Sequence, residues 1–165
     1  HPATCKGEKD GSITVTATQI TEPLALRYIL EKAQDTLYRT IVSDSQFELT
    51  NLGGGTVQMD LMQNTEVIHS THVLVMEPEA LRGKIIVKNA PAYPSDCNGK
   101  LQVEAEGGNP PYTYLWSENA QSATTAEVDH ICYGIYRCRI DDSKGCGPVH
   151  VSIPLVANTI KNYSE

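Results

Sequence analysis

A glycine-proline turn followed by alternating aromatic residues is the feature that most constrains the fold of this chain. Residues 107–117 read Gly-Gly-Asn-Pro-Pro-Tyr-Thr-Tyr-Leu-Trp-Ser, so that Tyr112, Tyr114 and Trp116 recur at every second position. The side chains of a β-strand point alternately to its two faces, and a turn of this kind marks where a strand begins. A second block at residues 134–142 has the same strand-like composition. Together the two blocks predict a small β-sandwich.

The chain carries two diverged copies of one pattern. In each copy a cysteine and a glycine-containing turn precede a strand with alternating residues. Further along each copy, a second glycine turn precedes another expected strand. Offsets of roughly 80 residues between matching segments are typical of tandem modules. The matching segments are residues 5–18 and 97–106, residues 47–59 and 126–138, and residues 73–76 and 149–153.

These copies predict an all-β chain of two tandem immunoglobulin-like antiparallel β-sandwich domains, at residues 1–80 and 81–165. Proline and charged residues interrupt the strand pattern near Pro78, where we place the boundary. Residues 24–35 contain helix-forming residues and permit a short helix. The repeat instead places a strand over residues 25–30, and we follow the repeat because local propensity is a weak guide against tertiary context.

Two aromatic residues occupy positions typical of immunoglobulin-like domains. Trp116 resembles the buried tryptophan of a middle strand, and Tyr136, two residues before Cys138, resembles a tyrosine corner. Val103 stands where the first inter-sheet cysteine of an antibody domain is expected, so that bridge is not expected here. The first copy lacks the aromatic strand, and we expect it to fill its core with other residues, namely Leu26, Tyr28 and Leu30.

Charge and cysteine content narrow the class of protein. The net charge is −7, with 13 basic and 20 acidic residues spread along the chain, which argues against binding to nucleic acid or to anionic lipid. No apolar run approaches the ~18 residues of a membrane span, so no membrane insertion is expected in this fragment.

The start lacks a leader sequence, and we expect a mature fragment of a longer protein. Five cysteines, four of them within residues 97–146, favour an oxidising compartment.

Four motifs in order carry a family resemblance. They are Cys-x-Gly-x-x-Asp-Gly-Ser-Ile at residues 5–13, Gly-Gly-x-Pro-Pro-Tyr-Thr-Tyr-x-Trp-Ser at residues 107–117, Gly-x-Tyr at residues 134–136, and Asp-x-x-Gly-Cys at residues 142–146. This pattern resembles the SprB-repeat modules of bacterial surface adhesins, which are typical of gliding and biofilm-forming Bacteroidetes. The second copy carries nearly the whole pattern, and the first copy is a diverged immunoglobulin-like repeat.

The resemblance implies a secreted or cell-surface array with an adhesive or scaffolding role and no catalytic residues. It also implies a disulfide between Cys97 and Cys146 that joins the ends of the second module. Cys5 occupies the place of Cys97 in the first copy but has no downstream mate there. Cys132 and Cys138 remain, and either they pair with each other or Cys138 is an inward-facing thiol.

Catalytic and metal-binding motifs were sought and not found, and we expect no enzyme and no metal site. The sequence has no nucleophile elbow, phosphate-binding glycine loop or zinc-protease motif. Residues 53–55 are three glycines without a following lysine, which indicates a turn. His69 and His72 lie three apart in an expected strand, on opposite faces, and are interpreted as solvated.

Two further sites have competing interpretations. Asp141 and Asp142 are candidate calcium ligands, but an Asp-rich turn that caps its own backbone explains them more simply. Tyr112, Tyr114 and Trp116 are candidate contacts for a sugar ligand, but aromatic residues on one face of a strand more often form a core.

We therefore expect a non-catalytic extracellular module that mediates attachment or scaffolding. Its expected partners are a surface glycan or protein ligand and neighbouring repeats of the same chain. The alternatives are a carbohydrate-binding accessory module of a secreted hydrolase, or a protein-recognition domain of a secretion or gliding machine. In the last case an exposed strand edge or an inter-module groove would bind the partner.

Overall fold

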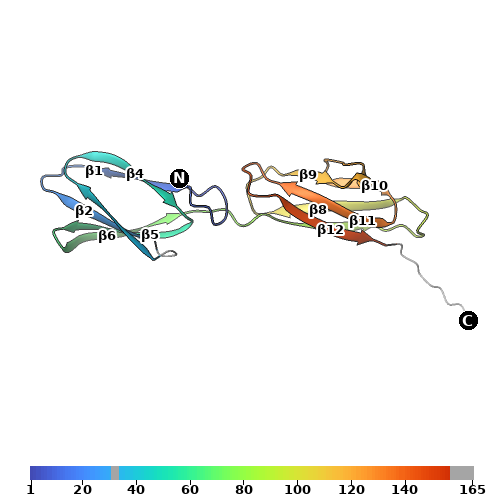
Figure 1. The fold of residues 1–165 in the computed structure, drawn as a ribbon, viewed down its shortest axis with the longest axis horizontal. Helices are drawn as coiled ribbons and strands as arrows, with labels where there is room; N and C mark the ends of the chain where they lie inside the picture. The colour runs from blue at the N-terminus through green and yellow to red at the C-terminus, as the bar shows by residue number, and fades with distance from the viewer. Residues whose placement is uncertain (31–33, 157–165) are drawn as a thin grey trace, which may run out of the picture. The chain divides into compact units, whose positions relative to one another are not determined.

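The chain divides into two compact β-sheet units. The computed structural model describes residues 1–30 and 34–156. Domain 1 runs from His1 to Pro78, and domain 2 begins at Glu79. Each domain consists of two antiparallel sheets (Figure 1). The predicted all-β fold of tandem immunoglobulin-like sandwiches is confirmed. No helix among these residues has the length and hydropathy of a membrane span.

Domain 1 pairs a two-stranded sheet with a four-stranded one. The small sheet has the order β1-β4 and the large sheet the order β3-β2-β5-β6. The strands are β1 (Gly11–Ala17), β2 (Leu24–Leu30), β3 (Asp35–Ile41), β4 (Ser45–Leu52), β5 (Gly55–Gln63) and β6 (Glu66–Val75).

Domain 2 contains two three-stranded sheets. Their orders are β10-β8-β7 and β12-β11-β9. The elements are β7 (Arg82–Asn89), β8 (Gly99–Glu106), β9 (Thr113–Trp116), the 3-10 turn η1 (Glu118–Ala120), β10 (Glu127–Ile131), β11 (Gly134–Asp141) and β12 (Val149–Leu155).

The two domains have the same strand order, except that each has one strand without a counterpart in the other. The pair β1-β4 corresponds to β8-β10, and β2-β5-β6 corresponds to β9-β11-β12. Domain 1 adds β3 beside β2, whereas domain 2 adds β7 beside β8. The internal repeat seen in the sequence is therefore a repeat of topology.

A glycine at the start of one strand has the same surroundings in both domains. Gly11 lies opposite Leu52, and a Cβ there would come 2.8 Å from the carbonyl oxygen of Leu52 and 2.7 Å from Val75. Gly99 lies opposite Ile131, and a Cβ there would come 2.8 Å from that carbonyl oxygen and 2.5 Å from a side chain of β12. Backbone atoms cannot yield as a flexible side chain can. Both positions therefore require glycine for the same reason.

The ambiguous segment after Pro23 is a strand. β2 covers residues 24–30 and pairs with β3 and β5, as the repeat predicts. Residues 31–33 of the helical alternative lie outside the described residues. Of the side chains expected to fill the core, Leu26 is buried, whereas Tyr28 and Leu30 are half-buried.

Each domain has its own apolar core between its sheets. The core of domain 2 contains two buried aromatic side chains, and the core of domain 1 contains aliphatic and methionine side chains. The buried residues are Leu81, Leu101, Val103, Trp116, Ala120, Val128, Ile131, Tyr136, Cys138, Ile140 and Leu155 in domain 2, and Leu26, Ile41, Leu49, Leu52, Val57, Met59 and Val75 in domain 1.

Candidate functional site

The aromatic strand of domain 2 is a core strand. Trp116 is 2% exposed, and its Nε1 donates a hydrogen bond of 2.9 Å to the Thr125 carbonyl oxygen. Tyr112 and Tyr114 are half-buried against the same core, and burial raises the pKa of Tyr114. The interpretation of Trp116 as a ligand contact is wrong, because its ring and its only donor are already engaged. The core interpretation is confirmed for Trp116.

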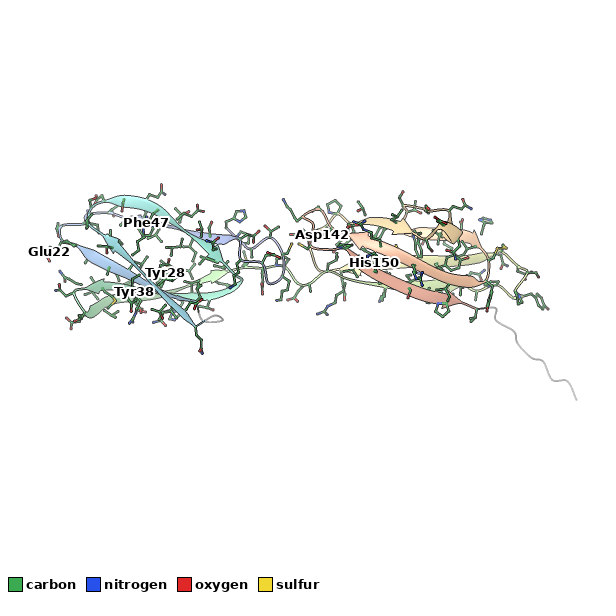
Figure 2. The ribbon with its side chains drawn as sticks, in the orientation of Figure 1. Glu22, Tyr28, Tyr38, Phe47, Asp142 and His150 are labelled. Atoms are coloured by element: carbon green, nitrogen blue, oxygen red, sulfur yellow. A yellow bond between two sulfur atoms is a disulfide. The ribbon has the colours of Figure 1, made fainter. Side chains whose placement is uncertain are left out.

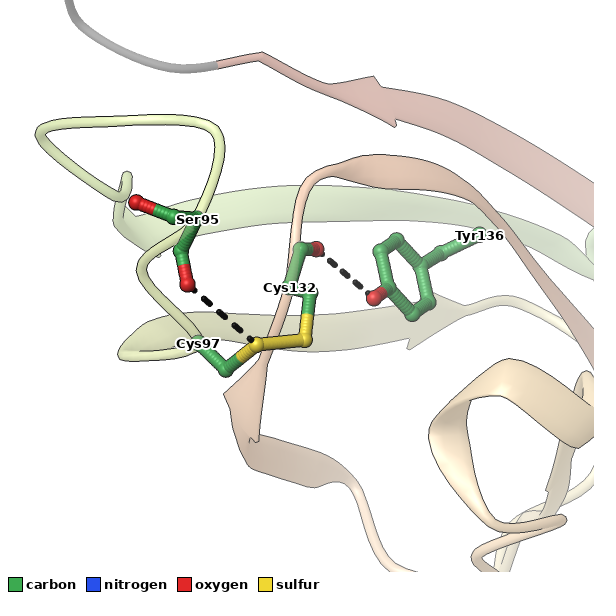
Figure 3. Close-up of a disulfide and its surroundings, with 4 residues drawn as sticks. All are labelled: Ser95, Cys97, Cys132 and Tyr136. Carbon is green, nitrogen blue, oxygen red and sulfur yellow. Dashed lines mark hydrogen bonds between the residues drawn. A yellow bond between two sulfur atoms is a disulfide. The ribbon is translucent and has the colours of Figure 1, made fainter.

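Tyr136 forms the predicted tyrosine corner. Its side chain is buried, and its hydroxyl donates to the carbonyl oxygen of Cys132, four residues upstream, at 2.8 Å (Figure 3). Two residues on, Cys138 is a buried free thiol, and burial raises its pKa to about 11. Val103 is likewise buried, so no inter-sheet bridge joins these positions, as the sequence predicts.

A disulfide within domain 2 links Cys97 to Cys132 (Figure 3). Strands β8 and β10 are antiparallel neighbours, with Gly99 opposite Ile131. The cysteine just before β8 and the cysteine just after β10 therefore meet at one end of this ladder. A structural disulfide indicates an oxidising compartment.

The Cys97–Cys146 pair that the resemblance implies is wrong, and of the two alternatives for Cys138 the inward-facing thiol is confirmed. Cys97 does not pair with Cys146, because Cys132, its actual partner, precedes β11 while Cys146 follows it. The eight residues of β11 separate those two ends by about 26 Å. Cys132 does not pair with Cys138, whose thiol is free and points into the core.

Asp142 caps the backbone of the turn between β11 and β12 (labelled in Figure 2). Its Oδ1 accepts N–H groups of Lys144 and Cys146 at 3.0 and 2.8 Å, and its Oδ2 accepts the Asn109 N–H at 2.7 Å. Burial opposes ionisation, but these donors outweigh it and lower the pKa of Asp142. Asp141 instead pairs with Arg139 at 2.8 Å. The backbone-capping interpretation is confirmed for Asp142.

The remaining sequence candidates lie in domain 1 and do not converge on one site. His69 and His72 are exposed on β6, opposite Leu61 and Gln58 respectively. Residues 53–54 form the short connection between β4 and β5, as the turn interpretation predicts. Among the described residues, no group of three or more His, Cys, Asp or Glu side chains converges to hold a metal ion.

Domain 1 contains a groove of about 540 Å³ that sequence reasoning missed. Strands β3 and β4 follow one another along the chain but join different sheets, so they form two sides of the groove. The lining is apolar in its deeper part and polar at its mouth. The apolar lining residues are Tyr28, Leu30, Leu37, Leu49, Leu52 and Val57, and the charged ones are Lys9, Asp35, Arg39, Glu48 and Glu77.

Tyr28 lines the groove of domain 1 at the position where domain 2 has the buried Trp116. In domain 2, Trp116 lies opposite Cys138 on β11, and in domain 1, Tyr28 lies opposite Met59 on β5. The two aromatic residues therefore occupy equivalent positions. Trp116 is buried and bonded at its nitrogen, whereas Tyr28 is half-buried and lines the groove (Tyr28 is labelled in Figure 2).

Several charged groups around the groove already have partners. Arg39 of β3 lies over the Phe47 ring of β4, with its guanidinium carbon 4.2 Å from the ring centroid. Glu77 pairs with Lys6 at 3.0 Å, and Glu48 accepts a hydrogen bond from the Ser12 hydroxyl. The contact between Arg39 and Phe47 joins the two strands that line the groove.

The outer face of the large sheet carries a polar row centred on Asp60. Asp60 is 1% exposed, and it accepts hydrogen bonds from Arg27 at 2.6 Å, Ser70 at 2.6 Å and Gln58 at 3.1 Å. These bonds, led by that from Ser70, lower the pKa of Asp60 to about 2. Every polar atom of this carboxylate is satisfied, so the row is a stabilising network across β2, β5 and β6.

The exposed apolar side chains of domain 2 include one pair on a sheet face and one pair in loops. Leu115 and Ile135 lie on the outer face of the β12-β11-β9 sheet, on the strand positions that alternate with the core residues. Tyr93 and Tyr133 are exposed in the loops that the disulfide joins. These tyrosines are more exposed than Tyr112 and Tyr114, which are half-buried, whereas Trp116 is buried.

The fold and the site place the chain among immunoglobulin-like β-sandwich proteins. The model of the SprB repeat family matches residues 94–121, which include Cys97, β8, β9 and Trp116. The resemblance read from the sequence is thereby confirmed for this part of domain 2. No curated protein matches the chain.

Among solved structures, the chain is similar to three multidomain proteins at low identity. A C-terminal 282-residue fragment of intimin, solved with an intimin-binding domain of its receptor, is 15% identical over 90% of this chain and 57% of that chain, with a TM-score of 0.38. A two-domain fibronectin type-III segment of chicken tenascin is 12% identical over 90% and 95%, with a TM-score of 0.37. The N-terminal eight Ig domains of Down Syndrome Cell Adhesion Molecule are 12% identical over 96% and 25%, with a TM-score of 0.39.

Proposed function

We propose that the chain is a non-catalytic adhesive or structural module of a larger cell-surface or secreted protein. The SprB-repeat match over residues 94–121 carries this proposal. The Cys97–Cys132 disulfide supports it, because disulfides persist outside the cytosol. The diverged domain 1, with the same strand order as domain 2, supports a place in an array of similar repeats. Its partners are a surface glycan or protein ligand and neighbouring repeats.

Two alternatives differ in the surface they use. A carbohydrate-binding accessory module needs exposed aromatic rings, and Tyr93 and Tyr133 supply these in domain 2. A protein-recognition domain needs an accessible strand edge or groove, and domain 1 supplies both. The groove is the observation that favours the second alternative over the first.

Bead attachment under flow tests the proposal. Beads coated with the full chain are passed over surfaces coated with polysaccharides, with matrix proteins or with the chain itself. We expect several-fold more attachment to at least one surface than for beads coated with the reduced, unfolded chain. A variant with both Tyr93→Ser and Tyr133→Ser, at exposed positions, separates glycan attachment from protein attachment. Equal attachment of folded and unfolded beads to every surface would count against the proposal.

A further inference from the structure

We infer that the groove of domain 1 binds an extended apolar segment of a partner protein, which adds a strand beside β3 or β4. This inference deepens the proposed function, because it names the class of partner that an adhesive module of this kind recognises. Three observations carry it: the apolar lining, the unpaired strand edges and the charges at the mouth.

The lining provides the hydrophobic contact. Leu30, Leu37 and Val57 line a groove of about 540 Å³, and volumes of this size are typical of ligand-binding clefts. Leu37 is 44% exposed although its neighbours on the same face of the sheet, such as Tyr28, are partly covered. An apolar segment in the groove would cover these side chains as Trp116 covers the core of domain 2.

The strand edges provide the backbone contact. β4 pairs only with β1, and β3 pairs only with β2, within the part of the chain that the structure describes. Each strand therefore has one edge whose N–H and C=O groups are not used by a neighbouring strand. An extended peptide forms backbone hydrogen bonds with such an edge, and every second side chain of the peptide enters the adjoining groove. A sugar or a compact ligand would leave these edges unused.

Exposed charges of the lining define which charged residues the segment carries. Lys9 approaches the groove next to Gly53, which follows β4, and Asp35 is the first residue of β3. These two charges have opposite sign, whereas Glu77 at the same groove is neutralised by Lys6. The segment that fits therefore alternates apolar and polar residues and carries an acidic and a basic side chain.

Peptide selection tests this inference on the full chain. A phage-displayed library of random nine-residue peptides is panned against the oxidised chain, and the affinity of the most enriched peptide is measured by fluorescence anisotropy. We expect enriched peptides to alternate apolar and polar residues. We also expect Leu37→Glu to weaken binding at least tenfold, because it places a charge in the apolar lining.

The neighbouring residue supplies the matched control. Tyr38 is 63% exposed and points to the opposite face of β3, so Tyr38→Glu should leave affinity within twofold of the unmodified chain. Asp35→Lys, at the mouth, should weaken binding several-fold without touching the core. Hydrogen exchange should show new protection of β3 or β4 amides when the peptide is bound.

Three results would overturn the inference. One is a library without enrichment, and another is a selected peptide that binds the Leu37→Glu and Tyr38→Glu variants equally well. The third is dimerisation of the chain that Leu37→Glu abolishes, because the groove would then hold a second copy. Loss of bead attachment with intact peptide binding would count against the proposed adhesive function alone, so the two failures are distinguishable.

Discussion

Domain 1 and domain 2 share a strand order but differ in how they complete the space between their sheets. Domain 2 fills it with Trp116 and Tyr136 and closes one end with the Cys97–Cys132 disulfide. Domain 1 has Tyr28 in the place of Trp116 and retains an accessible groove. The difference teaches that an immunoglobulin-like framework tolerates a half-buried tyrosine in the place of its buried central tryptophan. Tyr28 then lines a groove instead of a closed core.

Truncation of the equivalent aromatic residues should produce the largest difference between the two domains in the free energy of unfolding. Trp116→Ala should destabilise domain 2 by about 3–5 kcal/mol, because it leaves a cavity in a closed core. Tyr28→Ala should destabilise domain 1 by less, about 1–2 kcal/mol, because water already reaches that side chain. Residue-resolved hydrogen exchange on the full chain measures both. Equal losses would break the distinction between a filled core and an open one.

Removal of the disulfide should affect domain 2 alone. The bond joins residues 35 apart, and in the chain-entropy model closing such a loop stabilises the folded state by about 4 kcal/mol. The double variant Cys97→Ser and Cys132→Ser should therefore shift the urea midpoint of domain 2 and leave that of domain 1 in place. The double variant Cys97→Ala and Cys132→Ala, which removes the same bond without adding hydroxyl groups, provides the control for effects of the serines themselves. A joint shift of both transitions would show that the domains do not unfold independently.

The sequence was enough to predict the strands and the tyrosine corner, which depend on nearby residues. It was not enough to predict the disulfide partner and the groove, which depend on residues far apart in the chain. The strand ending at Trp116 and the corner at Tyr136 follow from alternation and from spacing along one strand. The partner of Cys97 depends on the pairing of β8 with β10, which are separated by β9 in the chain. The partner of Cys97 could not be predicted without that register, in which Gly99 lies opposite Ile131. The groove depends on β3 and β4 joining different sheets, for which neither strand carries a local signal.

The glycine pair tests whether the two domains are under the same steric constraint. Gly11→Ala and Gly99→Ala should each cost about 1–3 kcal/mol, because the added methyl group would meet a carbonyl oxygen at 2.8 Å. Gly7 has no neighbouring atom within 4 Å of its Cβ position, but its φ of +83° disfavours alanine. Gly53, whose nearest neighbours lie at 3.7 Å or more, is therefore the better control, and Gly53→Ala should cost less. Thermal unfolding measures all three variants, and a neutral Gly99→Ala would contradict the shared constraint.

The smallest expected effect is a dependence of domain 1 on acid. The hydrogen bonds of the folded state, led by that from Ser70, lower the pKa of Asp60 to about 2, below the usual range of an aspartate, so folding favours the ionised carboxylate. Stability from this group is complete above the unfolded pKa and is lost as the pH falls from about 4 to about 2. Asp60→Asn should lower the stability of domain 1 at neutral pH and flatten its decline across this range.

The control for the acid experiment lies in domain 2. Asp142 also has a lowered pKa, from backbone N–H donors that belong to domain 2. Asp142→Asn should therefore change the acid profile of domain 2 and leave that of domain 1 unaltered. An unchanged slope in the Asp60→Asn variant would assign the acid response of domain 1 to other carboxylates.

The Cys97–Cys132 bond also limits how far the chain can be drawn out by tension. When the ends of domain 2 are pulled apart, force bypasses the segment between the two cysteines and passes through the covalent bridge. The 35-residue separation then removes about 120 Å of extension that a reduced domain would release. In a protein that is anchored at one end and pulled at the other, each disulfide-bonded domain would release only a short, fixed extension when it unfolds. Oxidation therefore sets the reach of such a tether as well as the stability of its parts.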